Sequence, residues 1–367
     1  MGSISIVVLV VIVVGFAWNL GVHYTGAVMG MPYAARSIAL WPALILIAIF
    51  TILGATLASG GVEATVGQHI VSDRNVSIPD AIVIVFSAGI LTLLYNAQKM
   101  PTSTIQILVC CVVGVGLADH LPIYWGTIGK LAIVWICAPV VAFGLGFLFT
   151  RLFDLVVPPM LARSQTERQT SESLTGQKTN WVAHAFPGVA SSAQPWGEQA
   201  VPCALTVLAL RVLPLLLVCV GIAASFVLGA NDVSNATGVF LLTHLFSFTV
   251  AGLIGGVAMA IGALTWGHRI LKTVAFDVVK MDLTMASAAQ GVQALVVLAA
   301  VSQGFFTSMN QALIGAMAGT GAARGRETVH RKQIVGILRG WLIGPLSGFL
   351  LAFVLEWLSR LLLHLLA

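Results

Sequence analysis

Charged residues are scarce in this sequence. Asp, Glu, Lys and Arg make up only 8% of its 367 residues, whereas hydrophobic residues make up 58%. A soluble domain carries about 25% charged residues, because its surface faces water. A chain of this length with so few charges cannot cover a globule with polar groups. The composition therefore excludes a water-soluble globular protein and indicates a protein that is solvated by lipid.

Patterns typical of other protein classes are also missing. The five cysteines form no CxxC pair, so we expect free thiols and neither a metal site nor a disulfide framework; they are Cys110, Cys111, Cys137, Cys203 and Cys219. The sequence has no HExxH motif, no nucleophile elbow and no Walker loop, so we expect a protein that is not an enzyme and needs no cofactor. The net charge of +5 is typical of basic loops on the cytoplasmic side of a membrane, and we expect no nucleic-acid partner.

Eight long apolar runs are present instead. They cover residues 4–22, 38–58, 81–97, 131–150, 205–228, 240–265, 291–306 and 337–355. A helix that crosses a bilayer needs about 20 such residues, so each run predicts a transmembrane helix. The first run lacks a basic leader and a cleavage site, which favours a transmembrane helix over a signal peptide. Two shorter runs, at 105–118 and 312–323, predict re-entrant segments, which must be buried in protein or line a cavity.

The chain divides into two similar halves. A stretch rich in Ser, Thr, Gln and Gly lies between them, and we expect a first transmembrane repeat at 1–157, a polar cytoplasmic loop at 158–203 and a second repeat at 204–367. Matching positions recur in the same order: Gly21 and Gly229, Gly30 and Gly238, Thr102-Ser103 and Thr307-Ser308, Trp135 and Trp341. This pattern indicates an internal duplication. Duplicated membrane halves are typical of secondary transporters, in which the substrate binds where the repeats meet.

The most polar stretch beside an apolar run contains Asn231, Asp232 and Asn235. A carboxylate inside a membrane is costly, and an intramembrane ionisable residue is a functional candidate by default. Carboxylate and amide oxygens suit a hard cation such as Na⁺, and a carboxylate can also carry a proton. We therefore predict that these residues bind a coupling ion, H⁺ or Na⁺, and that the flanking glycines let the helix break. The alternative is that Asp232 caps a helix at the membrane interface.

Hydroxyl side chains open both of the short apolar runs. A helix that begins inside a membrane cavity presents free N–H groups and its positive dipole end to an anion. Hydroxyl groups add further donors around a tetrahedral oxyanion. The alternative is ordinary helix capping, which is the commoner role of Ser and Thr at such positions. The predicted substrate-binding residues are Thr102, Ser103, Thr104, Thr307, Ser308 and Asn310.

These motifs resemble those of a known family. Gly-Ala-Asn-Asp-Val-Ser-Asn-Ala at 229–236 and Pro-Thr-Ser-Thr at 101–104 are similar to the signatures of the inorganic phosphate transporter (PiT) superfamily. The likeness covers both halves outside the linker. It implies an all-α polytopic membrane protein with two inverted repeats and re-entrant helical hairpins. It also implies symport of phosphate or, in one bacterial branch, sulfate across the bacterial inner membrane, driven by Na⁺ or H⁺. The oligomeric state, monomer or homodimer, stays open.

The first half departs from the phosphate pattern. Tyr24 stands at the place of the aspartate, within a segment from which we assign Asn19 to the coupling ion and Gly21 and His23 to the substrate. Phosphate at neutral pH still carries a proton and benefits from a carboxylate acceptor, whereas sulfate has only acceptors and is repelled by one. We therefore predict a sulfate symporter, with phosphate as the alternative and a passive anion channel as a third reading. His23 could relay a proton or simply be a hydrogen-bonded core residue. For Glu63 we expect an interfacial surface position, with a second proton site as the alternative.

Overall fold

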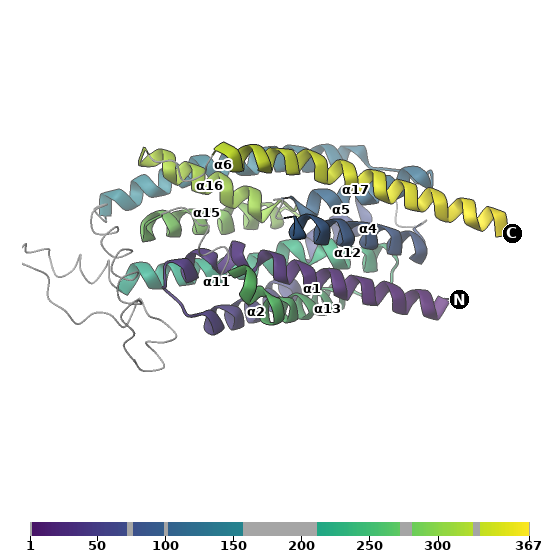
Figure 1. Cartoon of the computed structure of the whole chain (residues 1–367), viewed down its shortest axis with the longest axis horizontal. Coiled ribbons are helices and arrows are strands. Elements are labelled where there is room, and N and C mark those ends of the chain that lie inside the picture. Colours follow the sequence, from purple (N-terminus) through teal and green to yellow (C-terminus); the bar gives the residue numbers. More distant parts are fainter. Residues whose placement is uncertain are drawn as a thin grey trace, which may run out of the picture.

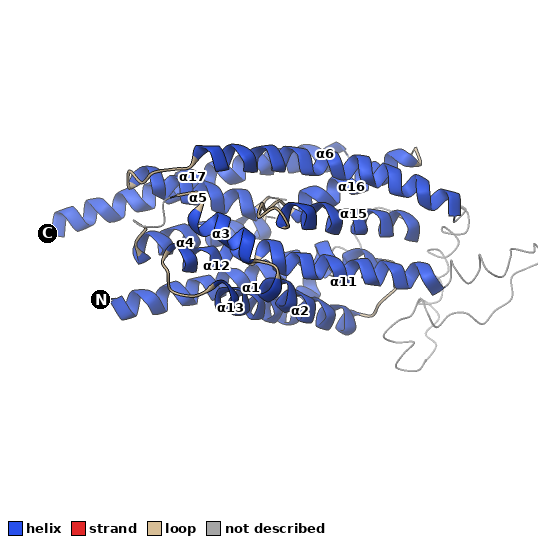
Figure 2. Cartoon of the chain, turned by 180° about the vertical axis from the view of Figure 1, so that it is seen from behind, coloured by secondary structure: helices blue, strands red, loops and turns tan. Residues whose placement is uncertain are grey.

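The computed structural model describes residues 2–71, 76–98, 102–156, 211–271, 281–325 and 331–366. Within these ranges the chain is helical, apart from turns and one isolated backbone bridge between Val71 and Ile123. The helices run along the long axis of the molecule (Figures 1 and 2). They are α1 (Gly2–Ala34), α2 (Leu40–Leu57), α3 (Gly60–Gln68), α4 (Ile78–Ala97), α5 (Thr104–Ala118), α6 (Trp125–Val156), α11 (Leu213–Asp232), α12 (Ser234–Leu242), α13 (Phe248–Gly262), the π-helical turn η3 (Ala263–Gly267), α15 (Leu283–Val301), α16 (Met309–Ala323) and α17 (Arg331–Leu366).

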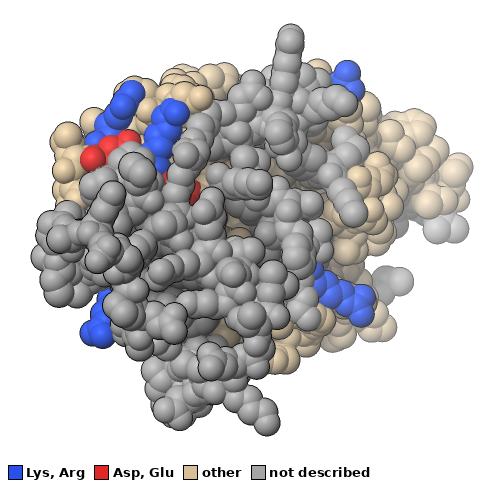
Figure 3. All heavy atoms as spheres, turned by 60° about the vertical axis from the view of Figure 1, so that its left-hand side comes forward, with Lys and Arg blue, Asp and Glu red and all other residues tan. Residues whose placement is uncertain are grey.

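Eight helical segments are long and apolar enough to cross a bilayer, as the eight apolar runs predict. They are Ser3–Ala34, Leu40–Leu57, Ile78–Ala97, Trp125–Val156, Leu213–Leu242, Phe248–Leu271, Leu283–Val301 and Arg339–Leu362. The outer helices expose large apolar side chains: on α6, Ile136 is 69% and Val140 67% exposed. In Figure 3 charged side chains are few among the described residues, and basic and acidic ones lie together at the upper left. Such a surface needs lipid as its solvent, and the chain is a multi-pass membrane protein.

Two apolar runs have ends that differ from the prediction. The run at 4–22 continues as α1 to Ala34, because the polar residues that follow it point into the protein and are no obstacle to a helix there. The run at 240–265 is interrupted after α12 by a turn in which His244 has a positive φ of 54°, and α13 begins at Phe248. Apolar side chains on both sides of this turn hide it from a hydropathy pattern.

Helices from the two ends of the chain pack on each other. The short helix α5 packs on α17 and the short helix α16 packs on α6, while α11 packs on α2 and α13 packs on α1. Figure 1 shows α4 and α5 towards the end of the molecule that carries both termini, and α15 and α16 towards the other end. The two parts of the chain are therefore interlocked and bury their polar residues against each other.

Glycines allow the closest of these helix contacts. A Cβ atom on Gly229 would lie 2.0 Å from the backbone oxygen of Thr51 in α2, and a Cβ on Gly21 would lie 1.9 Å from that of Met259 in α13. The helix is interrupted at the Asn-Asp motif, where α11 ends at Asp232 and α12 begins at Ser234, but no glycine lies at the interruption. Val233, between α11 and α12, keeps helical dihedral angles of −58° and −38°, and the glycines serve close packing instead.

A buried ion cluster fixes the far end of α16. Arg324, the C-cap of this helix, pairs with Asp154 of α6 and with Asp282, the N-cap of α15. Its guanidinium also donates to the hydroxyl of Thr284 at 2.7 Å. The Arg324 side chain is only 6% exposed, so these contacts compensate a charge that would otherwise be costly to bury.

A second ion cluster fixes the far end of α5. Arg360 of α17 donates to Asp80 in the first turn of α4 at 3.1 Å and to Glu356 at 2.9 Å, and it also pairs with Asp119, the C-cap of α5. Both short helices are thus held at their C-terminal ends by ion pairs to a long helix, while their N-terminal ends lie inside the protein.

Candidate functional site

The N-terminal ends of α5 and α16 have the same local structure. Ser103 caps α5, where its hydroxyl oxygen lies 3.5 Å from the N–H of Gln106, and Ser308 caps α16, where the corresponding distance to Gln311 is 3.4 Å. Both serines are completely buried. The capping role predicted as the alternative for these hydroxyls is therefore present. It leaves the other N–H groups of each first helical turn directed at the interior of the protein.

The Asp232 carboxylate lies at the end of α11 and is completely buried. It accepts hydrogen bonds from the side-chain amides of Asn231 at 2.9 Å and Asn235 at 3.3 Å. The hydroxyl of Tyr24 also interacts with it. Its partners among the described residues are neutral groups, so no basic side chain compensates its charge. This position excludes an exposed interfacial cap as the role of Asp232.

The residues around Asp232 are bonded to both short-helix N-termini. Asn231 donates to the backbone oxygen of Thr307 at 2.8 Å and accepts from its N–H at 3.1 Å. Asn235 donates to the Thr104 hydroxyl at 3.4 Å, and the Tyr24 hydroxyl lies 2.7 Å from the same oxygen. Predicted ion-binding and substrate-binding residues from distant parts of the sequence thus form one network.

Three predicted site residues of α1 have contacts outside the Asp232 network. His23 is 3.3 Å from the Asn310 amide, which joins it to the start of α16. Asn19 is 3.5 Å from Asn96 of α4, and its own amide nitrogen is buried without a partner. Gly21 instead lies against the backbone of α13, and its carbonyl accepts from Thr25 at 2.7 Å.

Several buried polar atoms of this region have no partner in the described protein. They are the Thr102 and Thr307 hydroxyls, the Gln106 carbonyl oxygen, both side-chain polar atoms of Gln311, and the Asn235 carbonyl oxygen. Leaving one such group unpaired costs about 1–3 kcal/mol. Their concentration at two helix N-termini is typical of a site whose ligand supplies the missing hydrogen bonds.

Some residues of this network were not predicted. Tyr24 was noted only as a replacement for aspartate, although its bond to Thr104 places it in the network. Gln106 and Gln311 are separated along the sequence by the same distance as Thr102 and Thr307. This match in the repeat is the sequence signal that could have placed both glutamines in the site. The predicted interfacial position of Glu63 is wrong: the residue is 0% exposed and accepts from Thr237 at 2.8 Å. Pro101 of the motif at 101–104 lies outside the described residues, as does the predicted loop at 158–203.

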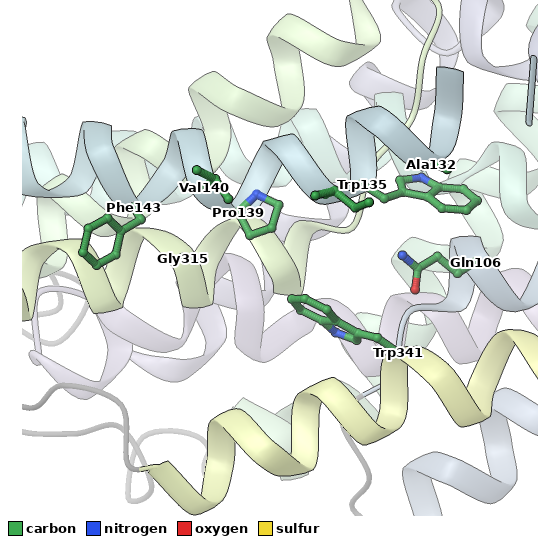
Figure 4. Close-up of a pocket in the computed structure, with 9 residues that line it drawn as sticks. Gln106, Ala132, Trp135, Pro139, Val140, Phe143, Gly315 and Trp341 are labelled. Atoms are coloured by element: carbon green, nitrogen blue, oxygen red, sulfur yellow. The ribbon is translucent and has the colours of Figure 1, made fainter. Parts of the chain in front are cut away.

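A cavity of about 760 Å³ lies between α6, α16 and α17. Figure 4 shows Trp135, Pro139 and Trp341 around it, with Gln106 reaching in from α5. Its walls are otherwise apolar. A charged oxyanion would lose its hydration there and would gain few donors beside the Gln106 amide, so this cavity is a poor site for it. The polar cluster at the helix N-termini remains the candidate site.

Known permeases and a solved transporter structure are similar to this chain. The sulfate permease CysP of Bacillus subtilis (strain 168) is 23% identical over 342 residues, which cover 93% of this chain and 84% of that protein. A putative phosphate permease of Thermococcus kodakarensis is 24% identical over 399 residues, covering 95% of this chain and 97% of the relative. A solved structure titled "The sodium-dependent phosphate transporter" has the same fold, with a TM-score of 0.79 at 20% identity over 97% of this chain and 99% of that chain.

The sequence pattern of the phosphate transporter family matches residues 20–361, which is nearly the whole chain. The match includes both short helices, the Asp232 network and six complete candidate spans, together with residues 20–34 of the first span and 339–361 of the last. The relatives are permeases and transporters, and no enzyme class is indicated. The chain therefore belongs to the phosphate transporter family.

Proposed function

We propose that this protein is an ion-coupled symporter of an inorganic tetrahedral oxyanion, with sulfate as its main substrate. The observation that carries this proposal is the pair of buried helix N-termini with the unpartnered hydroxyls of Thr102 and Thr307. Free N–H groups, hydroxyl donors and the positive ends of two helix dipoles form a binding site for an anion. The Asn310 and Gln311 amides add donors on the α16 side.

The choice of sulfate follows from the Tyr24 position. In the second half Asp232 supplies a carboxylate, whereas the first half presents the phenol hydroxyl of Tyr24, bonded to Thr104. A hydroxyl can donate to an oxyanion that has only acceptors. A carboxylate in its place would repel sulfate but would accept the proton that phosphate retains. A buried mismatch of this kind changes selectivity by orders of magnitude.

The coupling ion binds at Asp232. The unpartnered oxygen of Asn235 lies on the side chain that already bonds this carboxylate, so the pair offers oxygen ligands to Na⁺. A proton on Asp232 is the alternative coupling ion. Na⁺ is favoured by the shared fold with a structure titled "The sodium-dependent phosphate transporter". H⁺ is favoured by Tyr24, which stands where the first half would otherwise have a second aspartate to bind Na⁺. Asn231 bonds the Asp232 carboxylate and the Thr307 backbone. Asn19, another residue assigned to the coupling ion, contacts Asn96 instead.

Transport proceeds by alternating access between two inverted repeats. The packing of α5 on α17 and of α16 on α6 supports this arrangement, because each short helix is held by the other half of the chain. The short helices act as re-entrant hairpin arms that carry the oxyanion site at their tips. Loading of anion and coupling ion favours closure, and rocking of one half against the other releases both on the far side. The protein would work in a bacterial inner membrane.

Uptake of radiolabelled sulfate into proteoliposomes tests this function. We expect saturable, concentrative uptake under an imposed proton or sodium gradient, and only weak inhibition by excess phosphate. The gradient that drives uptake identifies the coupling ion. Uptake that phosphate abolishes, together with faster phosphate transport, would show a phosphate symporter, which is the function named for several relatives. Equilibration without accumulation under either gradient would show a passive channel.

A further inference from the structure

Glu63 is a buried carboxyl group that the proposed transport cycle does not yet use. It lies in the first turn of α3 and is 0% exposed. Its oxygen Oε1 lies 2.8 Å from the hydroxyl of Thr237, and the Ser59 side chain also interacts with the carboxyl group. Its oxygen Oε2 is buried, with no hydrogen bond within 3.5 Å to a described residue. A buried carboxylate in this setting must be compensated by a bound cation or a proton.

The groups around Glu63 offer no fixed positive charge. The helices that pack on α3 are mainly α12, α13 and α11. Within their described residues the ionisable side chains are Asp232 and the exposed thiol of Cys219, both on α11. His69 caps the other end of α3 and is exposed. The compensating charge therefore comes from an ion that can bind and leave.

The hydrogen bonds of Thr237 favour a proton. Its hydroxyl lies 3.0 Å from the backbone oxygen of Val233 as well as 2.8 Å from Glu63. A hydroxyl has one hydrogen, so it cannot donate to both oxygens. When Glu63 is protonated, its O–H donates to Thr237 and the Thr237 hydroxyl donates to Val233, so both contacts are satisfied. When Glu63 is ionised, Thr237 turns to donate to the carboxylate, which also benefits from the N-terminal end of the α3 dipole.

The position of Glu63 connects this proton to the transport site. Thr237 lies on α12, the helix that also carries Asn235 and begins directly after Asp232 and Val233. On the other side of α3, the Thr65 hydroxyl donates to the backbone oxygen of Gly304 at 2.6 Å, in the loop that leads to the start of α16. Protonation or ionisation of Glu63 can therefore shift α12, which carries part of the ion site, and the loop before α16, which carries part of the oxyanion site.

We propose that Glu63 is a second coupling carboxylate, which takes up one proton with each oxyanion from the outside and releases it inside. This inference rests on the proposed symport function. Sulfate carries two negative charges, so one coupling ion at Asp232 and one proton at Glu63 leave the loaded carrier with the same net charge as the empty one. An electroneutral cycle avoids moving a charge across the low-dielectric bilayer. The group at Glu63 thus replaces the carboxylate that the first half lost at Tyr24.

Voltage dependence of uptake tests this proposal. Sulfate uptake would be measured in proteoliposomes with a fixed proton gradient, while potassium and valinomycin set the membrane potential. We expect the wild-type protein to be indifferent to the potential. Glu63→Gln removes one proton from the cycle, so each turnover then carries one net negative charge. Its accumulation of sulfate should rise with an inside-positive potential, by up to about 50-fold per 100 mV. Glu356→Gln changes another buried glutamate and should stay indifferent to voltage.

The outcomes separate the two proposals. If the wild-type protein carries neither sulfate nor phosphate, the symport function is refuted. If the wild-type protein transports and Glu63→Gln remains voltage-independent at full accumulation, the role of Glu63 is refuted. A Glu63→Gln effect that appears only under a sodium gradient would overturn the choice of a proton.

A second variant decides the case in which Glu63→Gln fails to fold or to transport. Thr237→Val removes the hydroxyl that stabilises the ionised carboxylate, so proton release becomes harder. The pH of half-maximal uptake should then move upwards by about one unit. An unchanged pH profile of a folded, active Thr237→Val protein would overturn the proposal.

Discussion

Thr102 and Thr307 provide a test in which transport and stability change in opposite directions. Both hydroxyls are buried at the two short-helix N-termini and have no hydrogen-bond partner among the described residues. Substitution of either threonine by valine keeps the branched shape and removes only the hydroxyl. In the proposed function each hydroxyl donates to the bound oxyanion. A hydrogen bond to a charged group contributes about 1.5–3 kcal/mol. Since 1.4 kcal/mol corresponds to a factor of ten, each variant should raise the KM for sulfate by about 10–150-fold.

The stability of the same variants should not fall. A buried hydroxyl without a partner costs about 1–3 kcal/mol, and its removal leaves an apolar side chain of similar shape. We therefore expect a melting temperature in detergent equal to or above that of the wild-type protein. Thr150→Val is the matched control, because Thr150 on α6 is also 0% exposed and its hydroxyl also lacks a partner. Since Thr150 lies outside the candidate site, its variant should keep the wild-type KM.

The assay combines initial rates of labelled sulfate uptake into proteoliposomes with thermal unfolding of the purified protein. Three results would refute the reasoning. Thr102→Val and Thr307→Val could keep a KM within twofold of the wild-type value, which would remove the hydroxyls from the site. The Thr150→Val control could change the KM equally, which would indicate a general packing effect. A fall in melting temperature that matches the loss of uptake would mean that the threonines support the fold.

Three further substitutions have defined outcomes. Asp232→Asn should abolish gradient-driven accumulation of sulfate while counterflow exchange persists; unchanged accumulation would remove Asp232 from the coupling role. Arg324→Met removes the charge partner of the buried Asp282 carboxylate and of the partly exposed Asp154, and should lower stability by about 3–5 kcal/mol, measured as a lower melting temperature. Gly229→Ala places a Cβ 2.0 Å from the backbone oxygen of Thr51 and should sharply reduce the yield of folded protein, whereas Gly60→Ala, with no atom within 4 Å, should not.

The membrane architecture could be predicted from the sequence because its physical cause is local. A span needs about 20 apolar residues in a row, and this requirement can be read from any window of the chain. All eight runs correspond to helices long enough to cross a bilayer. The turn at His244 could not be predicted, because Phe246 and its apolar neighbours continue the hydropathy pattern across it. Helix ends depend on hydrogen bonds that composition does not record.

The candidate site was predictable only in part. The motif at Asp232 lies beside the backbone and hydroxyls at the short-helix starts, as the sequence predicts. A charged residue inside a membrane is costly, so its presence in the sequence already indicates a functional site. The roles of Tyr24 and Glu63 depend on which helices from the other end of the chain pack against them. Gly60 and Gly61, shortly before Glu63, resemble an interfacial turn in the sequence, but in the fold the α3 helix packs against α12.

The two ion clusters also bear on how the halves of the chain recognise each other. At the C-terminal ends of the short helices, Asp119 of α5 corresponds in spacing to Arg324 of α16, and on the long helices Asp154 corresponds to Arg360. Acid and base have exchanged places between the halves. A protein assembled from two first halves would set Asp119 against Asp154, and one assembled from two second halves would set Arg324 against Arg360. Like charges would therefore disfavour both, so the paired halves are complementary partners that can no longer substitute for one another.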